Sequence, residues 1–211
     1  MKNSQETTMR CFLAADLPES LKAAIGAIQE RLRRRIQGVR WTALAGMHLT
    51  LKFFGNIASD DIASISDVVR KALIGIRPIS LSIGNLGGFP SVKGPRVLWI
   101  GMSGDVDPLR RLQEVLDAGF QEDCGFEREK RPFKPHLTLG RAASMRGAMV
   151  GLAEVLKKNE SWQAATVSVR GLTLFKSELK PGGAVYSELE KYSFGSAGLA
   201  PGTEEADESA R

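Results

Sequence analysis

The sequence predicts an α+β protein built from two similar lobes, and three observations support this fold class. Segments with strand-like patterns alternate along the 211-residue chain with segments in which apolar residues recur every three or four positions, as on one face of a helix. The order helix, strand, helix, strand, loop, strand occurs twice. The tetrapeptide His-Leu-Thr-Leu also occurs twice, at His48 and His136, 88 residues apart. A repeat of this length exceeds a solenoid unit and indicates two lobes about a pseudo-twofold axis.

The first half of the chain contains the first set of elements. Asp16 and Pro18 have the chemistry that begins a helix, and Gly38 follows where this helix would end. Its apolar stripe consists of Leu21, Ile25, Ile28, Leu32 and Ile36. A second helix is predicted to begin after Ser59. Residues 84–95 are rich in Gly and Pro and are predicted to form a turn and loop. The predicted strands are residues 11–15, 39–41, 47–54, 79–83 and 96–100.

The second half repeats this order. Asp107 and Pro108 begin a third helix. The apolar stripe of a fourth helix consists of Met145, Met149, Leu152 and Leu156. Residues 181–183 are predicted to form the turn before the last strand. The predicted strands are residues 133–141, 166–175 and 184–192. The expected organisation is a flexible N-terminus (1–8), one bilobal domain (9–195, with repeats at about 9–102 and 103–195) and a disordered acidic tail (196–211).

The two His-Leu-Thr-Leu tetrapeptides are the strongest functional signal, because they contain the only two histidines of the chain. Their alternation of polar and apolar residues predicts half-buried strands, on which residues i and i+2 share a face. His48 and Thr50 would therefore lie side by side, as would His136 and Thr138. A lone His-x-Thr in a strand usually has no role, but two copies at matching places of a repeat favour catalysis.

Two such faces across a groove would supply acid–base chemistry at a phosphate. An imidazole accepts a proton, an imidazolium donates one, and both forms are accessible near neutral pH. Two histidines could therefore activate an attacking water and protonate a leaving oxygen without a metal. The hydroxyls of Thr50 and Thr138 could hydrogen-bond the nonbridging oxygens. Arg141, five residues after His136, offers a planar fork for a phosphate, although an arginine that ends a strand is commonly only solvated.

Three further residues are candidates for the substrate pocket, each with a structural alternative. Phe54 and Phe133 stand beside the two His strands and could line a nucleotide pocket or belong to the core. Ser177 could contact the substrate, but a polar hairpin would contain such a residue as well.

Composition and charge fit an anionic partner. The net charge is +5, and the tail from residue 196 carries four acids and one base, so the body carries about +8 (+5 without the −3 of the tail). Such an excess suits a nucleic acid. No apolar run approaches the roughly 18 residues of a membrane span, and the first residues lack the apolar core of a signal peptide. A cytoplasmic protein without a membrane partner is expected. Cys11 and Cys124 are expected to be reduced thiols.

Other catalytic chemistries find little support in the sequence. A zinc site needs three or four His, Cys or carboxylate ligands, and neither histidine has a carboxylate at a helical or strand offset. The chain also lacks a G-x-S-x-G elbow and a cysteine near a histidine. Metal-free acid–base catalysis remains the interpretation that the residues favour.

The paired tetrapeptides resemble the H-x-T-x motifs of the 2H phosphoesterase superfamily, and most closely those of its bacterial RNA 2′,3′-cyclic phosphodiesterase branch, also called 2′–5′ RNA ligases. The resemblance covers about residues 9–194. The stretches that support it are residues 10–18, 40–41, 48–55, 89–91, 95–99, 131–141 and 177–179.

The resemblance implies two antiparallel sheets that face each other across a central cleft, with helices on the outside. It implies hydrolysis of a ribose 2′,3′-cyclic phosphate to a 2′-phosphate without a metal or cofactor, with reversible 2′–5′ RNA ligation as an additional reaction. The family's catalytic and phosphate-binding residues correspond to His48, His136, Thr50, Thr138 and Arg141. The expected partner is an RNA or nucleotide with a 2′,3′-cyclic phosphate end, and the protein is expected to be a monomer.

The residues that come after each motif suggest different roles for the two histidines. Arg141 stands after the second motif, and Phe53 occupies the matching position after the first. A phosphate bound closer to Arg141 would place His48 near the departing 3′ oxygen, where it would act as general acid. His136 would then activate the water as general base. The alternative function is a noncatalytic protein that binds RNA ends in the same cleft.

Overall fold

The computed structural model describes residues 8–15, 17–91, 95–144, 149–158, 162, 164–181 and 183–195, and this part contains two antiparallel sheets. The four-stranded sheet, in the order β3-β1-β8-β9, consists of β1 (Thr8–Ala15), β3 (Leu49–Ala58), β8 (Gly171–Lys180) and β9 (Gly183–Ser193). The five-stranded sheet, in the order β2-β6-β5-β4-β7, consists of β2 (Val39–Trp41), β4 (Ile79–Phe89), β5 (Val97–Gly104), β6 (His136–Ala142) and β7 (Ala165–Val169). The predicted α+β fold class with two antiparallel sheets is confirmed.

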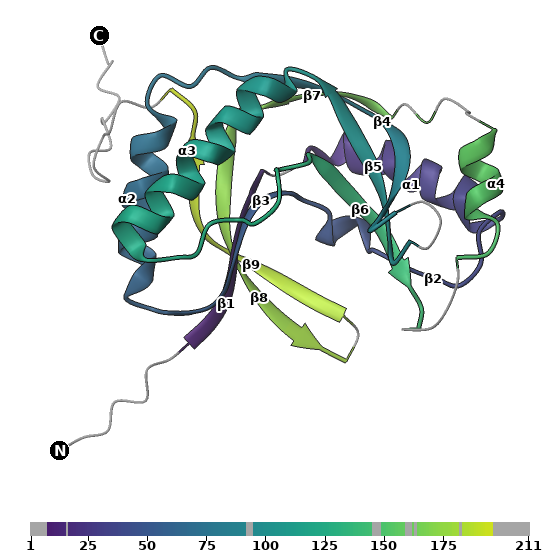
Figure 1. Cartoon of the computed structure of the whole chain (residues 1–211), viewed down its shortest axis with the longest axis horizontal. Coiled ribbons are helices and arrows are strands. Elements are labelled where there is room, and N and C mark those ends of the chain that lie inside the picture. Colours follow the sequence, from purple (N-terminus) through teal and green to yellow (C-terminus); the bar gives the residue numbers. More distant parts are fainter. Residues whose placement is uncertain are drawn as a thin grey trace, which may run out of the picture.

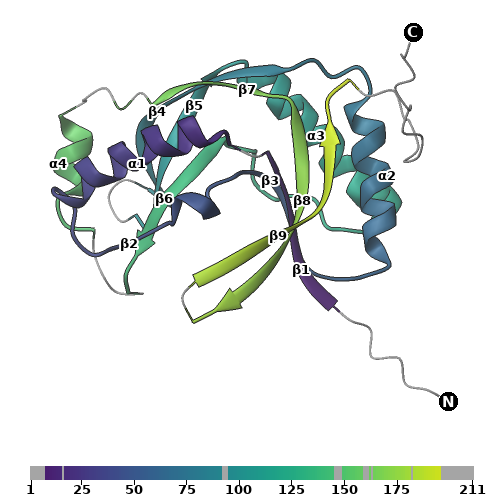
Figure 2. The ribbon, with the colours of Figure 1, turned by 180° about the vertical axis from the view of Figure 1, so that it is seen from behind.

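The helices lie on the outside of the two sheets (Figures 1 and 2). Helices α2 (Asp61–Leu73) and α3 (Val106–Cys124) lie together beside the four-stranded sheet. Helices α1 (Glu19–Arg33) and α4 (Leu152–Lys157) lie beside the five-stranded sheet, and a 3₁₀ turn at Leu44–Gly46 follows β2. Within the described residues, no helix has the length and apolar character needed to cross a membrane.

All five residues of the predicted apolar stripe, from Leu21 to Ile36, are buried. Helix α1 ends at Arg33, so Ile36 lies beyond it and Gly38 does not follow the helix directly. The same face carries one buried polar side chain. Gln29 donates from Nε2 to the main-chain oxygens of Thr42 (3.0 Å) and Leu139 (2.9 Å). These bonds join the helix to β6, which contains Leu139, and to Thr42, which directly follows the edge strand β2.

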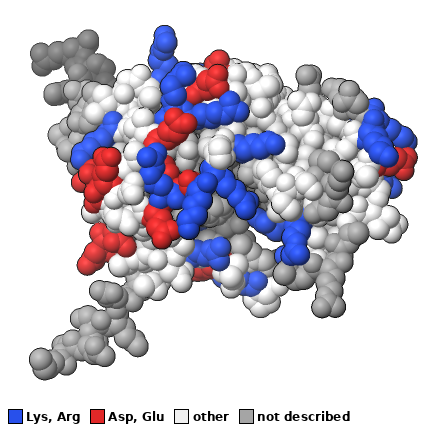
Figure 3. All heavy atoms as spheres, in the orientation of Figure 1, with Lys and Arg blue, Asp and Glu red and all other residues white. Residues whose placement is uncertain are grey.

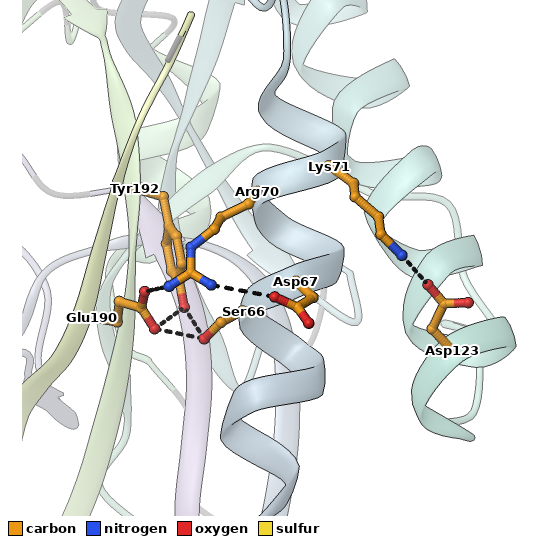
Figure 4. A network of polar contacts seen from close by, with 7 residues as sticks. All are labelled: Ser66, Asp67, Arg70, Lys71, Asp123, Glu190 and Tyr192. Carbon is orange, nitrogen blue, oxygen red and sulfur yellow. Dashed lines mark hydrogen bonds and ion pairs between the residues drawn. The ribbon is translucent and has the colours of Figure 1, made fainter. Parts of the chain in front are cut away.

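Helix α2 is joined to β9 by a network of polar contacts (Figure 4). The hydroxyl of Ser66 bonds Glu190 at 2.6 Å and the hydroxyl of Tyr192 at 2.8 Å, and Arg70 forms an ion pair with Glu190. Burial raises the pKa of Tyr192 well above its usual value, so its hydroxyl remains a neutral donor. The network holds the helix against the outer face of the sheet.

Strand β4 corrects the prediction that residues 84–95 form a turn and loop, because the strand continues to Phe89. Its second part pairs with β5 up to Phe89 and Val97, after an irregularity between Gly84 and Leu86. Gly87 is required here by packing: a Cβ atom would overlap the ring of Trp99 on the neighbouring strand. The glycines that suggested a loop therefore make room for an indole inside a sheet.

Other predicted boundaries also change. The single strand predicted at residues 166–175 is two strands, β7 and β8, which separate at Arg170 and belong to different sheets. Helix α2 begins at Asp61 with Asp60 at its N-cap, so Ser59 is not the cap. Helix α4 begins after Gly151, which has a positive φ of 88°, and the buried Met149 precedes it. Several predictions fall outside the described residues, namely those on Asp16, Met145, residues 1–7 and the acidic tail.

Each sheet combines strands from both halves of the sequence. The four-stranded sheet contains β1 and β3 from the first half and β8 and β9 from the second, and the five-stranded sheet contains β2, β4 and β5 together with β6 and β7. As a result, β3 and β6, which contain the two Leu-Thr-Leu segments, belong to different sheets. The two motifs therefore lie on separate sheets, and neither sheet is formed by one half of the sequence alone.

Candidate active site

Both histidine motifs contain a β-bulge directly after the threonine. In β3, Leu13 of β1 pairs with Lys52 and Ala14 pairs with Thr50, so Leu51 is the extra residue. In β6, Leu98 of β5 pairs with Gly140 and Trp99 pairs with Thr138, so Leu139 is the extra residue. A bulge shifts the alternation of side chains by one position. The fifth residue after each histidine therefore shares its face.

These two faces line one cleft of about 490 Å³, a volume typical of small-ligand sites. Six of the eight sequence-predicted site residues lie around it: His48, Thr50, Phe133, His136, Thr138 and Arg141. The same cleft is also lined by Phe12, Phe53, Phe89, Arg131, Lys134 and Tyr186. Figure 3 shows Lys and Arg side chains gathered in the middle of this side of the molecule, over the segment between α3 and β6.

Two predicted pocket residues do not line the cleft. Phe54 packs against Phe120 and Phe126, with ring centroids at 4.9 and 5.1 Å, on the side of β3 that faces α3. The bulge at Leu51 places Phe53 on the cleft face instead, opposite Phe12 of β1, and Phe54 is the extra residue of a second irregularity. Ser177 lies on β8, outside the set of cleft-lining residues.

His136 is held in one orientation by the segment that precedes it. Its Nδ1 lies 2.7 Å from the main-chain oxygen of Lys134. A carbonyl oxygen can only accept, so Nδ1 carries a proton and Nε2 of the neutral ring keeps a lone pair. Burial lowers the pKa of His136, the charges of Arg141 and Lys134 lower it further, and the hydrogen bond to Lys134 opposes them without cancelling the effect. The ring is therefore suited to accept a proton at neutral pH.

His48 is surrounded by aromatic rings. Its ring centroid lies 4.5 Å from that of Phe175, and it forms T-shaped contacts with Phe12 and Tyr186 at centroid distances of 5.7 and 5.3 Å. Phe12 and Tyr186 also line the cleft, so the half of the cleft at His48 is rich in aromatic side chains.

Several cleft residues were not named as site residues from the sequence, in which Phe53 was noted only as the counterpart of Arg141. Phe53, whose side chain is 59% exposed, stands at the cleft surface. The Lys134 ammonium lies 4.5 Å from the ring centroid of Trp99 and 5.6 Å from that of Phe89. No periodicity in a single sequence reveals where a bulge occurs, so Phe53 could not be separated from Phe54. Lys134 could have been suspected, since it stands two residues before His136.

The donor groups of the cleft are imidazoles, hydroxyls and cationic side chains. Within the described part of the chain, no group of three or more His, Cys, Asp or Glu side chains has the arrangement of a metal site. This arrangement can move protons and hold an anion, which is the equipment of a phosphoesterase that works by acid–base catalysis.

Comparison with known proteins assigns the family. The chain belongs to the 2′-5′ RNA ligase superfamily, whose family model matches residues 17–181. It is 34% identical over 184 residues to the RNA 2′,3′-cyclic phosphodiesterase of Methanothermobacter thermautotrophicus, with 87% of this chain and 98% of that protein covered. It is 32% identical over 194 residues to the protein of the same name from Thermus thermophilus, with 88% and 90% covered. The resemblance noted in the sequence is thereby confirmed.

Solved structures agree on the fold. TT0787 of Thermus thermophilus superposes with a TM-score of 0.74 at 29% identity, covering 90% of this chain and all of that one. LigT of E. coli in its apo form superposes with a TM-score of 0.68 at 24% identity, covering 89% and 98%. The two-sheet architecture is thus the one found in these proteins.

Proposed function

We propose that the protein hydrolyses the 2′,3′-cyclic phosphate at the end of an RNA or nucleotide to a 2′-phosphate, by paired-histidine catalysis that needs no metal. The names of its curated relatives, RNA 2′,3′-cyclic phosphodiesterase, support this substrate class. The observation that carries the proposal is that two His-x-Thr pairs from different sheets line one cleft.

In the proposed reaction, Nε2 of His136 takes a proton from a water molecule as its oxygen attacks phosphorus. The bond from phosphorus to the 3′ oxygen breaks, and His48 in its protonated form gives its proton to that oxygen. The product is a 2′-phosphate with a free 3′ hydroxyl, and the starting state returns when His136 releases its proton to solvent and His48 takes one up. If a 5′ hydroxyl of a second RNA replaces the water, the same steps form a 2′–5′ bond.

The assignment of base and acid is supported by the surroundings of the two rings. His136 has a lowered pKa and a fixed tautomer with an available lone pair, which suits a base. His48 stands in the half of the cleft that has Phe53 where the other half has Arg141, so a phosphate held by Arg141 would leave His48 for the departing 3′ oxygen.

The remaining cleft residues would hold the substrate. Thr50 and Thr138 would donate hydroxyl hydrogen bonds to the nonbridging oxygens, and Arg141 would bind them through its guanidinium. Phe53 and Phe133, both at the cleft, would contact the nucleoside. Stacking of a base on an aromatic ring tolerates every base, so strict base selection is not expected from this contact.

Turnover in the presence of a chelator tests the proposal. The protein, dialysed against EDTA, is expected to convert a nucleoside 2′,3′-cyclic phosphate to the 2′-phosphate alone, which phosphorus NMR distinguishes from the 3′ isomer. Loss of turnover that one added divalent ion restores would contradict the metal-independent mechanism. Tight binding of the cyclic phosphate without turnover would instead support the noncatalytic RNA-end binder.

A further inference from the structure

A buried ion pair lies directly behind the His48 motif. Lys52 stands two residues after Thr50 and also contributes to the lining of the cleft, but the bulge at Leu51 turns its ammonium towards α3. There its ammonium lies 2.6 Å from Oδ1 of Asp117, and the two side chains are only 5% and 6% exposed. Burial by itself raises the pKa of Asp117, but hydrogen bonds from Lys52 and from the main chain of Glu129 outweigh this and lower it, so the carboxylate is ionised.

Both charges also hold the main chain of one segment. Lys52 donates to the main-chain oxygen of Glu127 at 2.6 Å, and Oδ2 of Asp117 accepts from the main-chain N–H of Glu129 at 3.0 Å. The Arg128 side chain approaches the same carboxylate at 3.5 Å. The pair therefore fixes two backbone positions in residues 127–129 from two different elements, β3 and α3.

The fixed segment leads into the second histidine. Residues 125–135 form neither helix nor strand (Figure 1). The main-chain bonds that cap α3, from Gly125 to Gln121 and from Phe126 to Phe120, hold only the first two of them. Five of these residues line the cleft: Glu129, Arg131, Pro132, Phe133 and Lys134. The last of them provides the carbonyl that fixes the ring of His136. Displacement of this segment would therefore change the tautomer, burial and charge surroundings of His136 together.

We propose that Lys52 and Asp117 are positioning residues, which tie the strand after His48 to the segment before His136 and so set the geometry of the two half-sites relative to each other. The inference rests on the proposed function. Stability alone does not explain this buried ion pair, because well-packed apolar residues can often replace such a pair with no loss of stability. The hydrogen bonds to residues 127 and 129 are what an apolar pair could not supply.

The double variant Lys52→Met/Asp117→Leu separates positioning from stability. We expect its Tm to fall by no more than about 5 °C, since the pair is replaced by packed apolar groups. We expect kcat/KM for a nucleoside 2′,3′-cyclic phosphate to fall at least about tenfold, on the scale of misplaced catalytic groups. The acid limb of its pH profile should move to higher pH, because His136 would lose burial and the nearby Lys134 charge that lower its pKa.

A second readout does not depend on activity. The chain has two histidines, so labelling with ¹⁵N-histidine gives two rings to assign by NMR. In the parent protein, His136 should show a protected Nδ1 proton and a pKa below the usual histidine range. In the double variant the protection should be lost. If the parent protein lacks turnover, the proposed function fails, and this spectrum still tests the positioning role.

An exposed Lys–Asp pair provides the matched control. Lys71 on α2 and Asp123 on α3 form an ion pair of 3.4 Å, are 72% and 49% exposed, and do not line the cleft (Figure 4). Lys71→Met/Asp123→Leu should leave both readouts unchanged. Should the buried double variant not fold, Asp117→Asn replaces it. The amide has no charge, and its single oxygen cannot replace both carboxylate oxygens that accept from Lys52 and from the main chain of Glu129. The same changes are expected at smaller size. A folded variant with parental kcat/KM, acid limb and His136 spectrum would overturn the proposal.

Discussion

The two halves of the cleft are built alike but surround their histidines differently. In each half, a threonine two residues after the histidine is followed by a bulge, at Leu51 in β3 and at Leu139 in β6. The residue that emerges next on the cleft face is Phe53 in the first half and Arg141 in the second. The same motif and bulge thus bring one imidazole from each strand to the cleft. The residues around them differ, so the half at His48 is aromatic and the half at His136 is cationic.

Removal of either histidine should have the largest effect. We expect His48→Ala and His136→Ala each to lower kcat by at least about a hundredfold, the scale of a lost general acid or base. Both variants should keep the parental circular dichroism spectrum and bind the 2′-phosphate product. A near-normal rate in either variant would mean that the two halves do not act together.

The cationic half is tested by Arg141→Gln. A charge-assisted hydrogen bond contributes about 1.5–3 kcal/mol, so kcat/KM should fall by roughly 10- to 150-fold. Arg110→Gln, on the outer helix α3, is the control and should have no effect. If Arg141→Gln left kcat/KM unchanged, the phosphate would not lean towards the second half.

The aromatic half is tested by the neighbours Phe53 and Phe54. Phe53→Ala should raise KM by about tenfold, near the low end of the range for a lost base stack, and leave the free energy of unfolding nearly unchanged. Phe54→Ala should lower the free energy of unfolding by up to about 3 kcal/mol, the low end for a buried phenylalanine because the ring is only half-buried. Denaturant titration and steady-state kinetics measure both. The opposite pattern would place Phe54 in the cleft.

The smallest expected effect is a shift in pH dependence. The positive charge of Lys134 lowers the pKa of His136, so Lys134→Gln should raise that pKa and move the acid limb of kcat/KM to higher pH. The hydrogen bond from His136 goes to the main-chain oxygen and should persist. Lys180→Gln, paired with Glu178 on β8, serves as control. An acid limb that stays in place or moves to lower pH would show that this charge does not act on His136.

The sequence predicts most of the fold and the members of the paired motifs, because both depend on local periodicity. The apolar stripe of α1 and the two His-x-Thr strands follow from spacing alone. Boundaries failed where packing overrides local signals, as at Gly87, which fits Trp99 inside a sheet rather than forming a loop. Phe53 lines the cleft in place of the predicted Phe54 because of the bulge at Leu51. That bulge is set by pairing with β1 and cannot be predicted from the residues of β3.

The same limit applies to Lys52 and Asp117. They are 65 residues apart, and nothing in either segment predicts that they meet. Their contact depends on the bulge at Leu51 and on the placement of α3 beside the four-stranded sheet. Long-range pairs of this kind become visible only when the elements are assembled.

The central claim, that His48 protonates the departing oxygen while His136 activates water, is tested most directly by changing the leaving atom. In a 2′,3′-cyclic phosphate with sulfur at the bridging 3′ position, the thiolate leaves without a proton, because a thiol is far more acidic than an alcohol. We expect this substrate to restore turnover largely to His48→Ala and to leave His136→Ala inactive. Rescue of His136→Ala instead, with His48→Ala still inactive, would show that the two histidines have the opposite roles.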